Sequence, residues 1–142
     1  MKTLLAGLLL VPVSLGAGTT TRVDGIKQMI SREARKQGLD PAIAIAIAKI
    51  ESRLNPKAVG ALGEIGLFQI RPQFAPVSRR SLFDPATNIR VGVSMLVYAR
   101  SRCPAQKGLT WTTCHNTGVN KRPKYPAKLK YYKKFMEAYN DR

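Results

Sequence analysis

Apolar residues recur at helical spacing along most of the chain, and residues that typically begin or end helices flank them. The first predicted helix opens at Asp24 and stops at Gly38. Its apolar positions, three or four residues apart or adjacent, are Ile26, Met29 and Ile30. This spacing predicts an amphipathic helix with one buried face.

The second apolar segment, residues 42–50, alternates alanine with isoleucine except at Lys49. Alternation with period two is typical of a strand. However, alanine is the strongest helix former, and Asp40-Pro41 joins an N-cap residue to a proline at the first helical position. We therefore predict a helix buried nearly all round. It should end near Asn55-Pro56, because a residue before proline avoids the helical conformation.

The rest of the chain continues the helical pattern. Asp84-Pro85 repeats the cap-and-proline signal, and Arg71-Pro72 closes a short segment before it. The remaining predicted helices span residues 84–102, 110–115 and 128–140, and the predicted loops span 59–66 and 116–126. Since 142 residues suffice for one modest core, we predict a single all-α, or nearly all-α, domain.

The first eighteen residues have the layout of a secretory signal peptide. Lys2 precedes an apolar run over residues 4–13, and small residues follow it. An uncleaved membrane anchor or a buried first helix is the alternative. We predict a leader over 1–18 and a mature domain over 19–142, exported to the periplasm or cell envelope. No other stretch is long and apolar enough to span a bilayer.

The chain is strongly basic, with 24 Lys and Arg against 8 Asp and Glu and a formal net charge of +16. Such a surface is attracted to nucleic acid, anionic lipid or the acidic bacterial envelope. An exported protein meets envelope polymers first, and the sequence has no helix-turn-helix, zinc-finger or aromatic RNA-binding signature. Anionic envelope polymers are therefore expected partners, and nucleic acid is not.

Cys103 and Cys114 are the only cysteines. Two reduced thiols, or a metal site shared with His115, are possible alternatives to a disulfide. A structural zinc would need a fourth ligand that no nearby Cys or His supplies. Export favours one disulfide between the two cysteines, and no metal is expected.

Glu51 ends an otherwise apolar face of the second predicted helix, after Ala44 and Ile47. Burial and the negative end of the helix dipole both disfavour a charged carboxylate, so both should raise its pKa, as a general acid requires. The alternative is a frayed helix end, where Glu51 is solvated or paired with Lys49 or Arg53.

A longer motif surrounds this glutamate. It consists of Glu51-Ser52-Arg53-Leu54-Asn55-Pro56-Lys57-Ala58-Val59, Gly63, Gly66-Leu67-Phe68-Gln69-Ile70 and Pro72. The run resembles, without a gap, the central signature of the family-one (SLT-type) lytic transglycosylases. Three later segments extend the resemblance over residues 24–139: Asp84-Pro85-Ala86-Thr87-Asn88-Ile89 with Gly92, Cys114-His115-Asn116-Thr117-Gly118, and Tyr131-Tyr132-Lys133-Lys134-Phe135. The combination is highly specific.

The resemblance implies a lysozyme-like helical domain with an active-site cleft. It implies an enzyme that cleaves peptidoglycan between N-acetylmuramic acid and N-acetylglucosamine without water, leaving 1,6-anhydromuramic ends. Glu51 would be the catalytic acid and base, with Ser52 beside it. Gln69 and Asn116 would bind sugar, and Tyr131 would hydrogen-bond toward the glutamate. Peptidoglycan glycan strands are the expected substrate, no cofactor is expected, and we expect a monomer.

Two residues depart from the family pattern. His115 stands in place of the usual tyrosine, either as a titrating, sugar-contacting group or as a filled core position. Phe68 replaces the common methionine, and we expect it to pack in the core. Trp111 is also expected to pack between helices instead of stacking on a sugar. We expect Glu64 to be a solvated loop residue.

Two other functions compete with this interpretation. A hydrolytic lysozyme of goose type would need an ordered water and usually a second carboxylate, such as Glu64 or Asp84. A non-catalytic basic module that binds the envelope is supported by the cationic tail alone. A phage particle, a secretion or conjugation apparatus and general wall turnover are all compatible with the sequence.

Overall fold

A computed structural model of the protein describes residues 21–103, 109, 111–117 and 125–141, with side chains left out at 115–117 and 125–129. The predicted leader over 1–18 lies outside these residues. The elements in chain order are α1 (Arg22–Lys36), α2 (Pro41–Ser52), η1 (Pro72–Phe74), η2 (Arg80–Phe83), α3 (Pro85–Arg102), α4 (Thr112–Thr117) and α5 (Tyr125–Asn140). The only extended pairing in the described part is a set of isolated bridges, Val59 with Ile65 and Ile65 with Ile70. The predicted all-α class is confirmed.

Acidic and hydroxyl side chains cap the helix starts. The Asp40 carboxylate accepts from the Ala42 amide at 2.9 Å, and α2 begins where the sequence predicts. Asp24, in contrast, does not begin α1. Thr21 is the N-cap, and Asp24 completes a capping box from the third helical position, so α1 starts earlier than predicted.

The end of α2 also differs from the prediction. The helix stops at Ser52 instead of near Asn55-Pro56, because Arg53 and Leu54 adopt left-handed conformations with φ of 54° and 60°. This reversal brings Leu54 into the core, where only 8% of its surface is exposed. The burial of Leu54 in the core, and not the proline at position 56, therefore sets the end of α2.

α4 lies two residues later in the chain than predicted, and α5 is longer than predicted. α4 continues through Thr117, so Asn116 lies in a helix and not in the loop predicted over 116–126. α5 begins at Tyr125, and Pro126 falls in its first turn. Proline is tolerated there because the first amide groups of a helix have no partner within it. The short elements η1 and η2 were not predicted.

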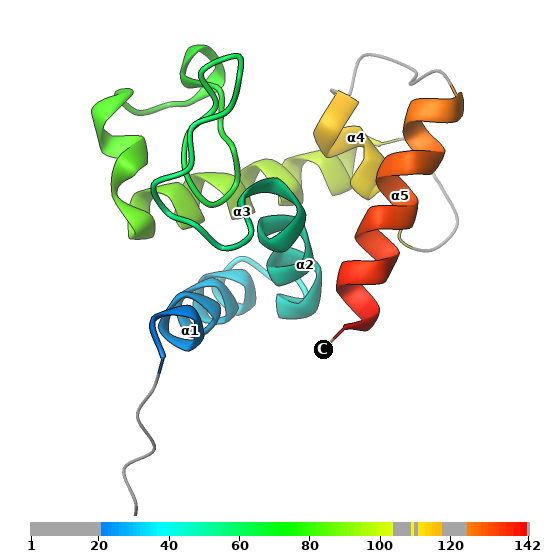
Figure 1. Ribbon diagram of the computed structural model, residues 1–142, viewed down its shortest axis with the longest axis horizontal. Coiled ribbons are helices and arrows are strands. Elements are labelled where there is room, and N and C mark those ends of the chain that lie inside the picture. Colours follow the sequence, from blue (N-terminus) through cyan, green and yellow to red (C-terminus); the bar gives the residue numbers. More distant parts are fainter. Residues whose placement is uncertain (1–20, 104–108, 110, 118–124, 142) are drawn as a thin grey trace, which may run out of the picture.

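α2 occupies the middle of the fold, where it contacts α1 on one side and α5 on the other (Figure 1). α3 packs against α1, η2 and α4. This arrangement carries the last turn of α2 toward α5 and the loop of residues 58–71. These three parts of the chain supply the candidate site.

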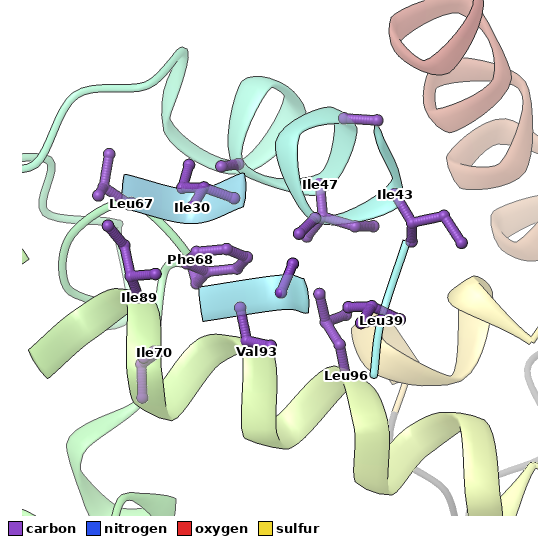
Figure 2. Close-up of a cluster of buried hydrophobic side chains, with 14 of the residues drawn as sticks. Ile30, Leu39, Ile43, Ile47, Leu67, Phe68, Ile70, Ile89, Val93 and Leu96 are labelled. Atoms are coloured by element: carbon purple, nitrogen blue, oxygen red, sulfur yellow. The ribbon is translucent and has the colours of Figure 1, made fainter. Parts of the chain in front are cut away.

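Phe68 lies in the middle of the main hydrophobic cluster, between side chains of α1, α2 and α3 (Figure 2). It is 1% exposed, which confirms its predicted packing role. A Cβ atom at Gly92 would lie 2.3 Å from its ring, so α3 can approach Phe68 only with glycine at that position. Trp111 is buried as well, as predicted.

A disulfide joins Cys103 to Cys114, as predicted. Cys103 caps the C-terminus of α3, and Cys114 lies in α4. The bridge therefore closes an 11-residue separation and ties α4 to the long helix.

We predict that removing this bridge lowers the free energy of unfolding by about 3 kcal/mol, because the unfolded chain regains the entropy of an open loop. Urea denaturation of the wild type with and without reductant measures the change. A Cys103→Ser/Cys114→Ser variant should match the reduced wild type and should not respond to reductant. Identical midpoints for oxidised and reduced protein would contradict the prediction.

Candidate active site

Glu51 lies in the last turn of α2, half-buried, and is bound by a residue from the other end of the chain. The hydroxyl of Tyr131, on α5, donates to Glu51 Oε1 at 2.9 Å. Lys49, a possible partner in the alternative interpretation, instead binds the Asp141 carboxylate at 3.2 Å. No ion pair of Glu51 is found in the described residues. Glu51 is therefore held in place and not frayed.

Burial raises the pKa of Glu51 above its ordinary value. The hydrogen bond from Tyr131 opposes this shift, the negative charge of Glu64 adds to it, and the positive charge of Lys134 opposes it. Burial and the adjacent carboxylate also raise the pKa of Tyr131, so this hydroxyl stays protonated and donates. The arrangement favours a glutamate that can hold a proton and release it.

Gln69 is held in a left-handed conformation, with φ of 45°. Its amide Nε2 donates to the carbonyl of Gly66 at 2.9 Å and to that of Ala58 at 3.3 Å. Because these bonds use both amide hydrogens, Oε1 is left as an acceptor, and it lies against Gly60 together with the Glu64 carboxylate. The side chain can therefore accept a hydrogen bond in a set direction.

Ser52 connects the end of α2 to the loop that carries Gln69. Its hydroxyl lies 2.9 Å from the carbonyl of Leu67 and 3.1 Å from that of Ala48, with geometry for donation to either. A hydroxyl has one hydrogen, so the two carbonyls share it. This contact positions the loop, and a direct contact of Ser52 with sugar stays a prediction.

Asn88, to which sequence reasoning assigned no role, holds the same loop from α3. It is 1% exposed, and its Nδ2 donates to the carbonyls of Ile65 and Leu82 at 2.8 and 2.9 Å. Its Oδ1 accepts from the Phe68 amide at 3.0 Å. A Cβ at Gly66, where φ is 74°, would lie 2.3 Å from Asn88 Nδ2. The sequence signal that could have identified Asn88 is its position four residues before Gly92. This spacing places a polar side chain on the buried face of α3.

Glu64 lies in the loop and is partly exposed, and it has partners there that the sequence did not predict. Its carboxylate accepts from Arg71 Nε at 3.2 Å and from the Leu62 amide at 2.9 Å. Hydrogen bonds from backbone amides, its own first, and the pairing with Arg71 lower its pKa. Glu64 is thus an ordered, ionised group whose charge acts on Glu51.

The side chains of His115 and Asn116 lie outside the described part of the structure. Both residues belong to α4, which contacts α5. Their sugar-binding roles stay predictions. The described residues contain no group of three or more His, Cys, Asp or Glu that could hold a metal ion.

Comparison with known protein families identifies the domain. Residues 28–138 match the family described as Transglycosylase SLT domain. The chain belongs to this family. The matched region of the SLT domain contains Glu51, Gln69 and Tyr131, and the match confirms the resemblance found in the sequence.

Relatives of this SLT domain include proteins named membrane-bound lytic murein transglycosylase C. The protein from Haemophilus influenzae strain PittGG is 30% identical over 109 residues, which cover 64% of this chain and 30% of the relative. The Histophilus somni strain 2336 protein is 29% identical over the same shares. The Mannheimia succiniciproducens protein is 32% identical over 80 residues, 48% of this chain and 22% of its own length. The chain thus spans less than a third of the length of these relatives. In its described part, no helix is long and apolar enough to cross a membrane.

We predict that Asn88→Ala lowers the free energy of unfolding by about 3 kcal/mol, because the buried Phe68 amide loses its acceptor and the carbonyls of Ile65 and Leu82 lose a donor. Chemical denaturation measures the loss. Asn140→Ala, at an exposed position of α5, is the matched control and should change stability by less than about 0.5 kcal/mol. Equal losses for the two variants would contradict the assignment.

We also predict that Glu51→Gln stabilises the protein at neutral pH. The raised pKa means that the folded state holds the Glu51 proton more tightly than the unfolded chain does. Stability is then lost as pH rises from the ordinary glutamate pKa through the raised value. Gln stays neutral, so the gain should be present at pH 7 and absent below the ordinary pKa. Thermal unfolding at both pH values tests this, and a pH-independent difference would refute it.

Proposed function

We propose that the protein is a peptidoglycan lytic transglycosylase that cleaves the bond between N-acetylmuramic acid and N-acetylglucosamine. The observation that carries this proposal is Glu51, a half-buried carboxyl with a raised pKa that a tyrosine hydroxyl holds in place. Membership of the SLT domain family and relatives named as murein transglycosylases support the reaction and the substrate.

In the first step, protonated Glu51 gives its proton to the oxygen that links the two sugars. The bond from this oxygen to the anomeric carbon of the muramic acid breaks, and the acetamido oxygen of the same sugar stabilises the resulting positive charge. Tyr131 donates to Oε1, which stabilises the carboxylate that is formed. General acid catalysis of this kind requires the raised pKa of Glu51.

In the second step, the Glu51 carboxylate acts as a base. It removes the proton from the 6-hydroxyl of the muramic acid, whose oxygen bonds to the anomeric carbon and closes the anhydro ring. The proton that Glu51 gave is thereby returned, and no water is consumed. One carboxyl group serves both steps, so no second catalytic carboxylate is needed.

The hydrolytic alternative would need a second carboxylate to activate water. Its two candidates both have other partners: Glu64 pairs with Arg71, and Asp84 caps α3 by accepting from the Thr87 amide at 2.8 Å. These contacts favour the transglycosylase. The net charge of +16 supports action at the anionic envelope, where we place the protein as a monomer. The non-catalytic module gains no support from Glu51.

We predict that Glu51→Gln abolishes turnover of purified peptidoglycan while binding is retained. Gln keeps the size of Glu but cannot deliver a proton. Loss of general acid catalysis alone lowers a rate by about a hundred- to ten-thousand-fold, and the same group also acts as the base here. Mass spectrometry of the wild-type products should find anhydromuramic ends, lighter by one water than hydrolysis products.

Glu33→Gln, on α1, makes the same change away from the site and should leave turnover intact. Reducing muramic acid as the main wild-type product would assign the protein to the hydrolases. A fully active Glu51→Gln variant would exclude Glu51 as the acid. Binding without any cleavage by the wild type would favour the non-catalytic module.

A further inference from the structure

The glycine at position 60 leaves space for two side-chain oxygens. A Cβ atom there would lie 2.4 Å from Glu64 Oε2 and 2.7 Å from Gln69 Oε1, well inside van der Waals contact. The backbone of Gly60 does not itself require glycine, because its φ lies outside the left-handed region that Gly63 and Gly66 adopt. The carboxylate of Glu64 and the amide oxygen of Gln69 therefore share the space that a larger residue at position 60 would fill.

Both of these oxygens are hydrogen-bond acceptors. Backbone carbonyls use the two amide hydrogens of Gln69, so its Oε1 can only accept, and no donor reaches it from the described residues. The Glu64 carboxylate is ionised, since its pKa is lowered. Arg71 binds its Oε1 and the Leu62 amide binds its Oε2, yet each carboxylate oxygen has two lone pairs. Two neighbouring acceptors repel each other unless donors lie between them.

The two acceptors lie near Glu51 and can be reached from solvent. The negative charge of Glu64 is close enough to raise the pKa of Glu51, so it belongs to the surroundings of that carboxyl. The Glu64 side chain is 18% exposed, and Gln69 is also partly exposed. The family resemblance implies sugar binding for Gln69 and no role for Glu64. A ligand that contacts Gln69 Oε1 would nevertheless also meet the Glu64 carboxylate.

We propose that Glu64 is a substrate-binding residue that accepts a hydrogen bond from the N-acetylglucosamine ring bound by Gln69. This inference rests on the proposed function, because a glycan strand is the ligand. N-acetylglucosamine carries its acetamido N–H and a hydroxyl on neighbouring carbons, and two adjacent acceptors match two adjacent donors. In N-acetylmuramic acid the lactyl ether replaces that hydroxyl, so one donor is missing. The ionised Glu64 should bind its donor more strongly than the neutral amide does.

The test measures binding in the Glu51→Gln background, where neither cleavage nor the protonation of Glu51 contributes. The probe is a tetrasaccharide of alternating N-acetylglucosamine and N-acetylmuramic acid, and calorimetry gives its affinity. The further change Glu64→Gln should weaken the affinity about tenfold, because a charged hydrogen bond becomes a neutral one. Glu33→Gln, on α1, is the matched control and should leave the affinity unchanged. Equal affinities for these two variants would overturn the proposal, since water alone would then fill the space between the oxygens.

Two further variants in the same background separate sugar binding from support of the loop. Arg71→Gln breaks the Glu64–Arg71 ion pair but keeps the carboxylate, so the affinity should change by less than about twofold. Gly60→Ala displaces both oxygens, and it should weaken the affinity at least as much as Glu64→Gln does. A loss with Arg71→Gln as large as that with Glu64→Gln, or full affinity with Gly60→Ala, would overturn the binding role.

The same measurements keep this inference separate from the proposed function. Failure of the wild type to cleave glycan strands would overturn the enzymatic proposal, whereas the tetrasaccharide affinities alone decide the role of Glu64. If Glu64 acted only through its charge on Glu51, Glu64→Gln would shift the pH profile of kcat in the otherwise wild-type enzyme. It would then leave the affinity in the Glu51→Gln background unchanged, and this result would exclude Glu64 as a ligand of the sugar.

Discussion

The fold depends on burying α2 along most of its length while leaving a carboxyl group at its last turn. Ile43, Ala44 and Ile47 are buried, and α2 packs against α1 and α5, so a rotation of the helix that exposed Glu51 would also expose this apolar face. The carboxyl is consequently only partly hydrated, and burial is the largest cause of its raised pKa. The packing that buries α2 is therefore also what raises the pKa of Glu51.

The opposing influences on Glu51 come from different parts of the chain. Glu64, on the loop, favours the protonated form, whereas the Tyr131 hydroxyl and the Lys134 charge, both on α5, favour the carboxylate. The proposed reaction, in which Glu51 first gives a proton and then takes one back, needs such a balance, because a strong bias to either form would hinder one of the two steps. The packing of α5 against α2 thus affects the pKa of Glu51 as well as the stability of the fold.

The loop of residues 58–71 has little regular structure, and side chains from both neighbouring helices hold it. Ser52 binds it from α2, Asn88 binds it from α3, and the Glu64–Arg71 pair closes it on itself. These contacts give Gln69 a defined orientation without a strand or helix of its own. Phe68, from the same loop, fills the core, so the loop is at once part of the hydrophobic core and part of the site.

The sequence by itself determined the helical class and the caps of α2 and α3, because these depend on local propensity. It also predicted the packing of Phe68, the disulfide between the two cysteines and Glu51 as the candidate acid, from residue type and from a motif with a close family resemblance. Only the tertiary structure decided where α2 ends, since Leu54 packs in the core before the proline acts. It also decided the role of Asn88 and the ordered state of Glu64. Asn88 binds a loop that folding brings against α3, and Glu64 binds Arg71 where the loop turns back on itself. Neither kind of side-chain hydrogen bond leaves a periodic signal in the sequence.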